Sequence, residues 1–395
     1  MLKKLCVFLA VVISLGGFAG CKNGLEENEK DLSEYDLTAY MSPFWEGDIV
    51  YNETAMVLKN EDGSISPVGL MYEIGSVIAV RNYGLDTLYE EGKDYEVQNG
   101  KLVIKDNGAI YSDMALDYDQ YYFPEYDGSN NLASNGGGIL KTEASNGAQG
   151  LCKWQLSVTY THEKTDSPIG VPRTFSDKFS KTIAKLKSGE KTNLVCLGDS
   201  ISAGWSASGY QYCNIAPLCP PYFNLVTDYL GMYYENENID AANFSVGGMK
   251  TDWGREDAQI QSAVKENPDL LIIAFGMNDG VSGGFSPAAY KENTLAIIDG
   301  VRAGCSDTEI ILVSPMLPNA EAANMLVNQY NYVAVLNEIA SERGNVAVAD
   351  VGTLSFRLLQ LKKFRDMSAN NINHPNDFMH RVYAQTIVKT IADIL

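Results

Sequence analysis

The sequence predicts two folded parts, an α/β domain built on a parallel sheet and a smaller all-β domain before it. Short alternating strand patterns with few helical segments fill residues 41–166, whereas apolar strands alternate with helix-length segments over residues 192–395. The total of 395 residues fits two domains at about 150 residues each. We expect a linker and a leading helix between them, at 167–191.

The net charge and the small number of histidines argue against several classes of binding site. The chain has 50 acidic against 30 basic residues, a net charge of −20, and such a surface repels nucleic acids and anionic lipid head groups. Three histidines (His162, His374 and His380) are too few for a histidine-rich metal site, and no cysteine–histidine cluster has zinc-site spacing. We therefore expect no metal, no cofactor and no nucleic-acid partner.

The N-terminus has the composition of an export signal. Lys3 and Lys4 precede an uncharged apolar run, which is too short to span a membrane and has the length of a signal-peptide core. Phe18-Ala19-Gly20-Cys21 resembles a bacterial lipobox, so residues 1–20 are expected to be cleaved and Cys21 to be lipidated. Residues 21–40 follow as a flexible acidic tether. The sequence thus predicts an exported lipoprotein of the outer membrane, on its periplasmic or cell-surface face, that touches the membrane only through its lipid.

Strand patterns in the first part indicate a small β-sandwich. Residues 76–83 and 154–160 read as strands, and residues 94–104 read as two strands joined by Asn99-Gly100. An Asn-Gly pair tolerates the positive φ angles of a tight hairpin turn.

In the second part of the chain, the spacing of apolar residues changes to that of helices and buried strands. A helix is expected from Phe175 to Leu186, with Gly189 as its stop, and another is expected to open at Ser286-Pro287. Four segments are apolar at consecutive positions, so both of their faces are expected to be buried; they lie at 194–197, 270–275, 310–313 and 346–349. This pattern predicts parallel strands covered by helices on both faces of the sheet. Ligands of such sheets gather at the carboxyl ends of the strands.

Polar motifs stand near those ends and close to the C-terminus. They are Gly198-Asp199-Ser200-Ile201, Gly247-Gly248, Gly276-Met277-Asn278-Asp279 and Asp377-Phe378-Met379-His380. In this order the four blocks resemble those of the SGNH (GDSL-type) hydrolases, over residues 193–395. The resemblance implies a flavodoxin-like three-layer α/β/α domain and a serine esterase.

Elementary chemistry gives each matched residue a role. Ser200 needs a base to take its proton, and we expect His380 to be that base, with Asp377 three residues earlier to orient the ring. The backbone N–H groups of Ser200 and Gly248 and the side chain of Asn278 are expected to form the oxyanion hole.

His374 competes for the role of base. Pro375 follows it, as proline commonly follows the catalytic histidine of this family. Position 371 is an asparagine, so no carboxylate precedes His374 by three residues, and this favours His380.

Other polar residues receive structural interpretations. Asp199 is expected to hold the nucleophile turn, and Asp279 to cap the segment after it. Cys213 and Cys219 are close enough in sequence for a disulfide, which the spacing permits without requiring.

The resemblance leaves the substrate open. The two-part plan of an exported protein is similar to bacterial carbohydrate esterases, so we expect a small acyl group, such as acetyl, on an acylated carbohydrate. A lipase, lysophospholipase or thioesterase is the nearest alternative, and an inactive glycan-binding lipoprotein is another. Aromatic side chains that either bind sugar or pack are Trp205, Tyr210, Tyr212 and Trp253 near the motifs, and Tyr118, Tyr121, Tyr122 and Tyr126 in the first part.

Overall fold

The computed structural model describes residues 32–124, 132–142 and 150–395. The predicted signal peptide, Cys21, most of the tether and Tyr126 lie outside these residues. Asp31–Leu395 form one compact unit. Within the described residues, no helix has the length and apolar character needed to cross a membrane.

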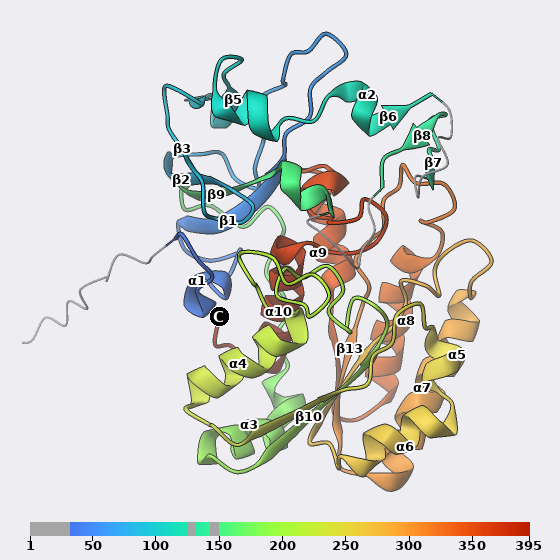
Figure 1. Ribbon diagram of the computed structural model, residues 1–395. Coiled ribbons are helices and arrows are strands. Elements are labelled where there is room, and N and C mark those ends of the chain that lie inside the picture. Colours follow the sequence, from blue (N-terminus) through green and yellow to red (C-terminus); the bar gives the residue numbers. More distant parts are fainter. Residues whose placement is uncertain (1–31, 125–131, 143–149) are drawn as a thin grey trace, which may run out of the picture. The chain divides into compact units, whose positions relative to one another are not determined.

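The first part is rich in β-structure, as expected (Figure 1). Its largest sheet is antiparallel with strand order β1-β9-β2-β3, beside the hairpin β4-β5 and the small sheet β6-β8-β7. Asn99 and Gly100 have positive φ angles (50° and 69°) and form the predicted turn. The elements are α1 (Leu37–Tyr40), β1 (Ile49–Met56), β2 (Ser76–Asn82), β3 (Leu88–Tyr89), β4 (Tyr95–Gln98), β5 (Lys101–Ile104), η1 (Ile110–Met114), α2 (Tyr118–Tyr121), β6 (Tyr122–Phe123), β7 (Leu132–Ala133), β8 (Ile139–Leu140), η2 (Gly150–Trp154) and β9 (Gln155–Thr161).

The second part is the predicted α/β domain. Its five strands are parallel in the order β11-β10-β12-β13-β14, which is the flavodoxin-like order. The elements are η3 (Ser176–Phe179), α3 (Ser180–Ser188), β10 (Thr192–Gly198), α4 (Tyr222–Tyr234), β11 (Ile239–Asn243), α5 (Thr251–Gly254), α6 (Asp257–Lys265), β12 (Leu270–Ala274), α7 (Pro287–Gly304), β13 (Glu309–Val313), α8 (Gln329–Glu342), β14 (Val346–Ala349), α9 (Val351–Leu358), η4 (Phe364–Asp366) and α10 (Asp377–Ile391).

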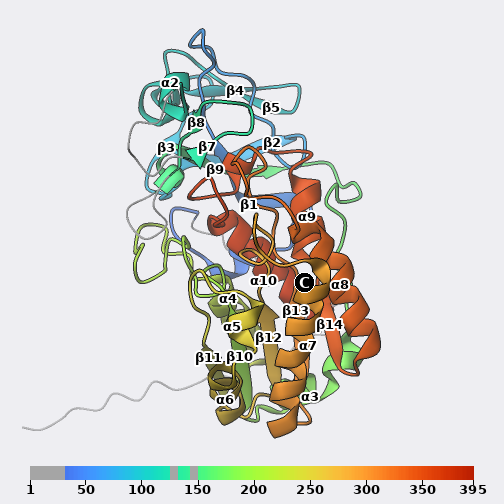
Figure 2. The ribbon, with the colours of Figure 1, turned by 90° about the vertical axis from the view of Figure 1, so that its right-hand side faces the viewer.

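Alternating strand residues build the two faces of this sheet. On β10, Leu194 and Cys196 join the core that contains α3, α4, α9 and α10, whereas Val195 and Leu197 join the core with α6, α7 and α8. Figure 2 shows the helices flanking the sheet. Ser286 caps α7 by accepting from Ala289 N, and Gly189 ends α3 at φ 71°, both as predicted.

Helix α10 is buried along its whole length, although it carries charged and polar residues. Backbone groups of the N-terminal part bind two of them: the Arg381 guanidinium donates to Tyr40 O and Asn52 O, and Gln385 Nε2 donates to Tyr40 O and Ser42 O. The β-rich part therefore covers α10 directly, and one hydrophobic core includes residues of both parts.

An ion pair without solvent contact fixes the segment after α9 to strand β1. Lys362 Nζ donates to Glu53 Oε1 and to Thr54 O, and both charged side chains are fully buried. Glu53 also accepts from Met71 N and the Tyr160 hydroxyl, so its carboxylate is well solvated by protein groups.

We predict that Lys362→Met destabilises the fold by about 3–5 kcal/mol, because it leaves the buried Glu53 carboxylate without its cation. Urea unfolding measures this loss. Adding Glu53→Gln to Lys362→Met should restore part of it. The control is Lys191→Met, which breaks an exposed pair with Asp240 and should hardly move the midpoint. Equal midpoints for the two single variants would contradict the prediction.

Candidate active site

The nucleophile turn follows β10 and depends on a glycine. A Cβ at Gly198 would lie 2.4 Å from Ser202 Oγ and 2.7 Å from Ala274 O, so only glycine fits there. Asp199 holds the turn, as predicted, by accepting from Ile201 N (2.9 Å). Ser200 sits next to it with only 3% of its surface exposed.

His374, and not His380, contacts the nucleophile. Ser200 Oγ and His374 Nε2 are 2.8 Å apart, which is a hydrogen-bond distance. The ring of His380 is occupied elsewhere: its Nδ1 accepts from Tyr222 N (3.3 Å), and its Nε2 faces Trp205 O at 3.2 Å. This corrects the predicted pairing, since both nitrogens of His380 bond to backbone groups and neither reaches Ser200.

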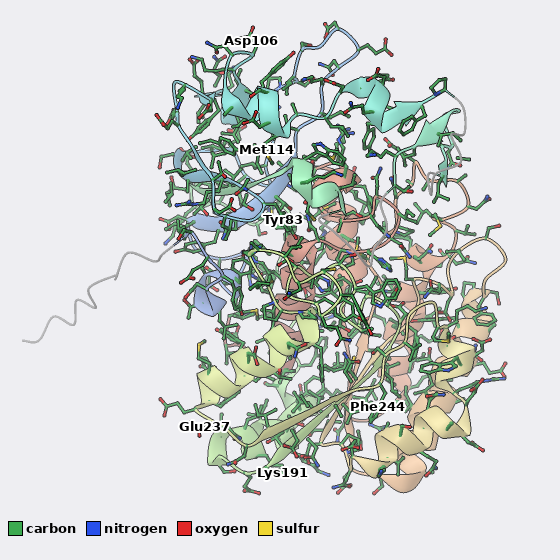
Figure 3. The ribbon with its side chains drawn as sticks, in the orientation of Figure 1. Tyr83, Asp106, Met114, Lys191, Glu237 and Phe244 are labelled. Carbon is green, nitrogen blue, oxygen red and sulfur yellow. The ribbon has the colours of Figure 1, made fainter. Side chains whose placement is uncertain are left out.

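Asp377 does not orient the histidine that contacts Ser200. Its Oδ1 accepts from Ser208 N (2.8 Å), its own N–H donates to the Tyr83 hydroxyl, and Oδ2 has no partner within the described residues. Tyr83 lies where the β-rich and α/β parts meet (Figure 3). Burial raises the pKa of Asp377 to about 6.

Asn371 stands three residues before His374, where a triad would have its acid, and its side chain bonds to groups other than His374. Its Nδ2 donates to the Tyr121 hydroxyl (2.9 Å) and to Lys141 O (2.8 Å). His374 Nδ1 is buried and has no hydrogen-bond partner among the described residues. The site therefore contains a serine–histidine pair in which no described acid contacts the imidazole.

Backbone bonds and an indole ring hold His374 instead. Asn370 Oδ1 accepts from the N–H groups of Ile372, Asn373 and His374, and Ser368 Oγ donates to His374 O. The ring of Trp205 packs edge-on against the imidazole, with 5.5 Å between ring centres. These contacts fix the direction of the ring without an acid.

The N-terminal part fixes the loop that carries His374. Gln155 Nε2 donates to Arg365 O (2.7 Å) and to Ser368 O (2.8 Å). Asn376 Nδ2 donates to Thr54 Oγ1 and Gln155 Oε1, both at 2.9 Å. We call residues 362–376 the histidine loop, and strands β1 and β9 supply much of its hydrogen bonding.

The predicted oxyanion donors lie on neighbouring strand ends. Val246 N donates to Gly198 O (3.1 Å), which brings the Gly248 turn beside the nucleophile turn, and Gly248 adopts φ 78°. Asn278 Nδ2 donates to Met249 O (3.0 Å) and has a second N–H to offer. Among the described residues, no acceptor faces the N–H of Ser200 or of Gly248. Their role as oxyanion donors stays a prediction.

Burial controls the protonation of the site. It lowers the pKa of His374 to about 3, with a smaller contribution from His380, and it lowers the pKa of His380 to about 4. Both imidazoles are therefore neutral at pH 7. A neutral Nε2 beside the Ser200 hydroxyl is free to accept its proton.

The remaining predicted residues take structural positions. Asp279 does not cap the segment after it: it accepts from the backbone N–H (2.9 Å) and hydroxyl of Thr251, at the start of α5. Cys213 and Cys219 do not form the disulfide that their spacing permits. Trp253 packs on Phe275, with 6.3 Å between ring centres.

Comparison with known proteins agrees with this architecture. Residues 196–382 match the model of the GDSL-like lipase/acylhydrolase family, a range that contains Ser200, Gly248, Asn278 and His374. No curated protein matches the chain.

Solved structures similar to this chain include the following three. A two-domain esterase active on acetylated mannans is 21% identical, covers 55% of this chain and 53% of its own, and gives a TM-score of 0.42. A catalytic mutant of an acetylxylan esterase from Geobacillus stearothermophilus is 19% identical over 51% of this chain and 94% of its own, with a TM-score of 0.42. TesA is 20% identical over 52% of this chain and 100% of its own, with a TM-score of 0.39.

This chain thus spans about half the length of the two-domain esterase that it matches. The match to the GDSL-like lipase/acylhydrolase family falls within the α/β part, and it includes the Ser200–His374 contact.

Proposed function

We propose that the protein removes acetyl or similarly small acyl groups from carbohydrates, using Ser200 and His374 as a catalytic dyad. The observation that carries this proposal is the 2.8 Å contact between Ser200 Oγ and His374 Nε2, with no acid on the other ring nitrogen among the described residues. A neutral imidazole at this distance is the base that a serine nucleophile requires.

The reaction follows from this geometry. Ser200 Oγ attacks the ester carbonyl carbon while His374 Nε2 takes its proton, and the new oxyanion meets the donors at Ser200, Gly248 and Asn278. The bond to the sugar oxygen breaks, and that oxygen receives the proton from His374. Water then repeats both steps on the acyl-enzyme, releasing the carboxylic acid and restoring Ser200.

The surroundings of Ser200 favour a small acyl group. The nucleophile is nearly buried, and the ring of Trp205 lies close to the catalytic pair. It lies against His374 and also near Gly247, where an added Cβ would come within 3.0 Å of the indole. We expect this ring to limit the length of the acyl chain.

We also propose that the protein is exported and held at the membrane by a lipid on Cys21. This part of the proposal rests on the sequence, because Cys21 lies outside the described residues.

Variants of the two histidines test which of them is the base. His374→Ala should lower kcat on a nitrophenyl acetate substrate by about 10²–10⁴-fold, the usual contribution of a general base. Matched variants of the other candidates, His380→Gln and Asp377→Asn, should stay within about tenfold of wild type, since neither side chain contacts Ser200. Circular dichroism checks that each variant is folded. Loss of activity in a folded His380→Gln protein, together with survival in His374→Ala, would restore the original assignment.

A series of nitrophenyl esters from acetate to palmitate tests the acyl group. Because Trp205 restricts the site, kcat/KM should peak at acetate and fall as the chain lengthens, and Ser200→Ala should abolish all of it. A peak at long chains would support the lipase or thioesterase alternative. Absence of any serine-dependent hydrolysis would contradict the proposed activity.

A further inference from the structure

We propose that a cationic groove beside the histidine loop binds a carboxylate on the substrate, so that the glycan is an acidic, uronate-bearing one. This inference rests on the proposed function, and it names Arg365 as the central cation. Residues 362–365 of the histidine loop form part of the groove's wall.

Two cavities adjoin this segment. One has a volume of about 430 Å³, and its lining includes Lys59, Lys101, Tyr118 and Tyr122 from the N-terminal part. The other, of about 670 Å³, is bordered by apolar side chains that include Tyr330 and Phe356. Lys362, Lys363 and Arg365 line both cavities, so the two adjoin, and we call them together the groove and each of them one half.

The first half is cationic although the chain as a whole is strongly acidic. Its one acidic lining residue, Asp366, accepts from Met56 N and Lys363 N. Glu53 neutralises Lys362, and Asp117 neutralises Lys59. Within the described residues, Lys101, Lys363 and Arg365 make no ion pair. Lys101 and Lys363 have no acidic partner among the described residues, and Arg365 has only the nearby Asp366 carboxylate, so in a protein of net charge −20 this half is complementary to an anion.

Arg365 is the strongest sign of a missing anion. Its Nε is buried without an acceptor, and no ion pair joins its guanidinium to a described carboxylate, although the Tyr121 side chain and the nearby Asp366 carboxylate raise the pKa of Arg365. Arg81, Arg302 and Arg381 also have an unpaired buried nitrogen, but each donates to backbone carbonyls through another one. A guanidinium held this way is costly to leave unpaired, and its planar fork suits a carboxylate.

Contacts inside the protein connect the groove to the loop that carries His374. The Arg365 guanidinium lies 5.4 Å from the centre of the Tyr121 ring, and the Tyr121 hydroxyl bonds to the side chain of Asn371. Asn371 precedes His374 by three residues. Arg365 and His374 thus belong to the same loop, and we expect a sugar anchored at Arg365 to bind along it.

Aromatic rings on the other half suit sugar faces. Tyr330 and Phe356 pack with 5.4 Å between ring centres and are 54% and 41% exposed. Exposed aromatic surface next to fixed cations matches the apolar faces and the carboxylate of a uronate-bearing oligosaccharide.

The test compares two acetylated oligosaccharides, one neutral and one uronate-bearing, as substrates of wild type and Arg365→Gln. We expect wild type to prefer the acidic oligomer by at least tenfold in kcat/KM. Arg365→Gln should reduce this preference about tenfold or more, because a charge-assisted bidentate bond is lost. Lys363→Gln, at an exposed position, should reduce it less. The control Arg173→Gln removes a cation outside the groove and should leave the preference unchanged.

A second measurement separates this proposal from the proposed function. Ser200→Ala is titrated with a deacetylated uronate oligomer, and binding should weaken as salt rises and in the Ser200→Ala/Arg365→Gln double variant. Binding without any deacetylase activity would support the groove and refute the proposed function. Deacetylase activity with equal rates on both oligomers and no uronate binding would refute the groove alone. Binding of phosphatidylglycerol vesicles in place of the uronate oligomer would overturn the glycan assignment in favour of a lipid.

Discussion

The active site depends on hydrogen bonds that join the histidine loop to two strands of the N-terminal part, β1 and β9. The nucleophile turn is built by the α/β sheet alone, because Gly198 and Asp199 fix it locally. The base is different: Gln155 and Thr54 of the N-terminal part bond to the loop that carries His374. The N-terminal part is therefore a structural component of the site and not a spacer beside it.

A dyad follows from the same arrangement. Asn371 stands at the sequence position of the acid that would orient His374, and its amide donates to the Tyr121 hydroxyl of the N-terminal part. The imidazole takes its direction from loop bonds and from Trp205. Burial without an acid keeps the pKa of His374 low, which makes it a base available at neutral and mildly acidic pH. The cost is a weaker base, since no carboxylate stabilises the imidazolium.

Local patterns in the sequence predicted the fold well, together with the place of Ser200 in the turn after β10. The Asn99-Gly100 hairpin, the Ser286 cap and the parallel strands each depend on neighbouring residues, and the structure contains all three. The choice between His380 and His374 depended on a spacing rule that requires an acid, and this chain has none at that position. Contacts such as Gln155 to Ser368 join residues more than 200 positions apart, and no local pattern reveals them. The one available signal was Pro375 after His374.

The most direct test of this account is the rate at which a serine-directed phosphonate labels Ser200 in Gln155→Glu. This change is nearly isosteric and lies in the N-terminal part, but it replaces the amide that donates to Arg365 O and Ser368 O with a carboxylate. Our account predicts labelling at least about tenfold slower in a folded protein, because His374 loses its fixed position. The matched control Glu96→Gln, on strand β4, should label at the wild-type rate. Equal labelling of Gln155→Glu and wild type would contradict the claim that the N-terminal part positions the catalytic base.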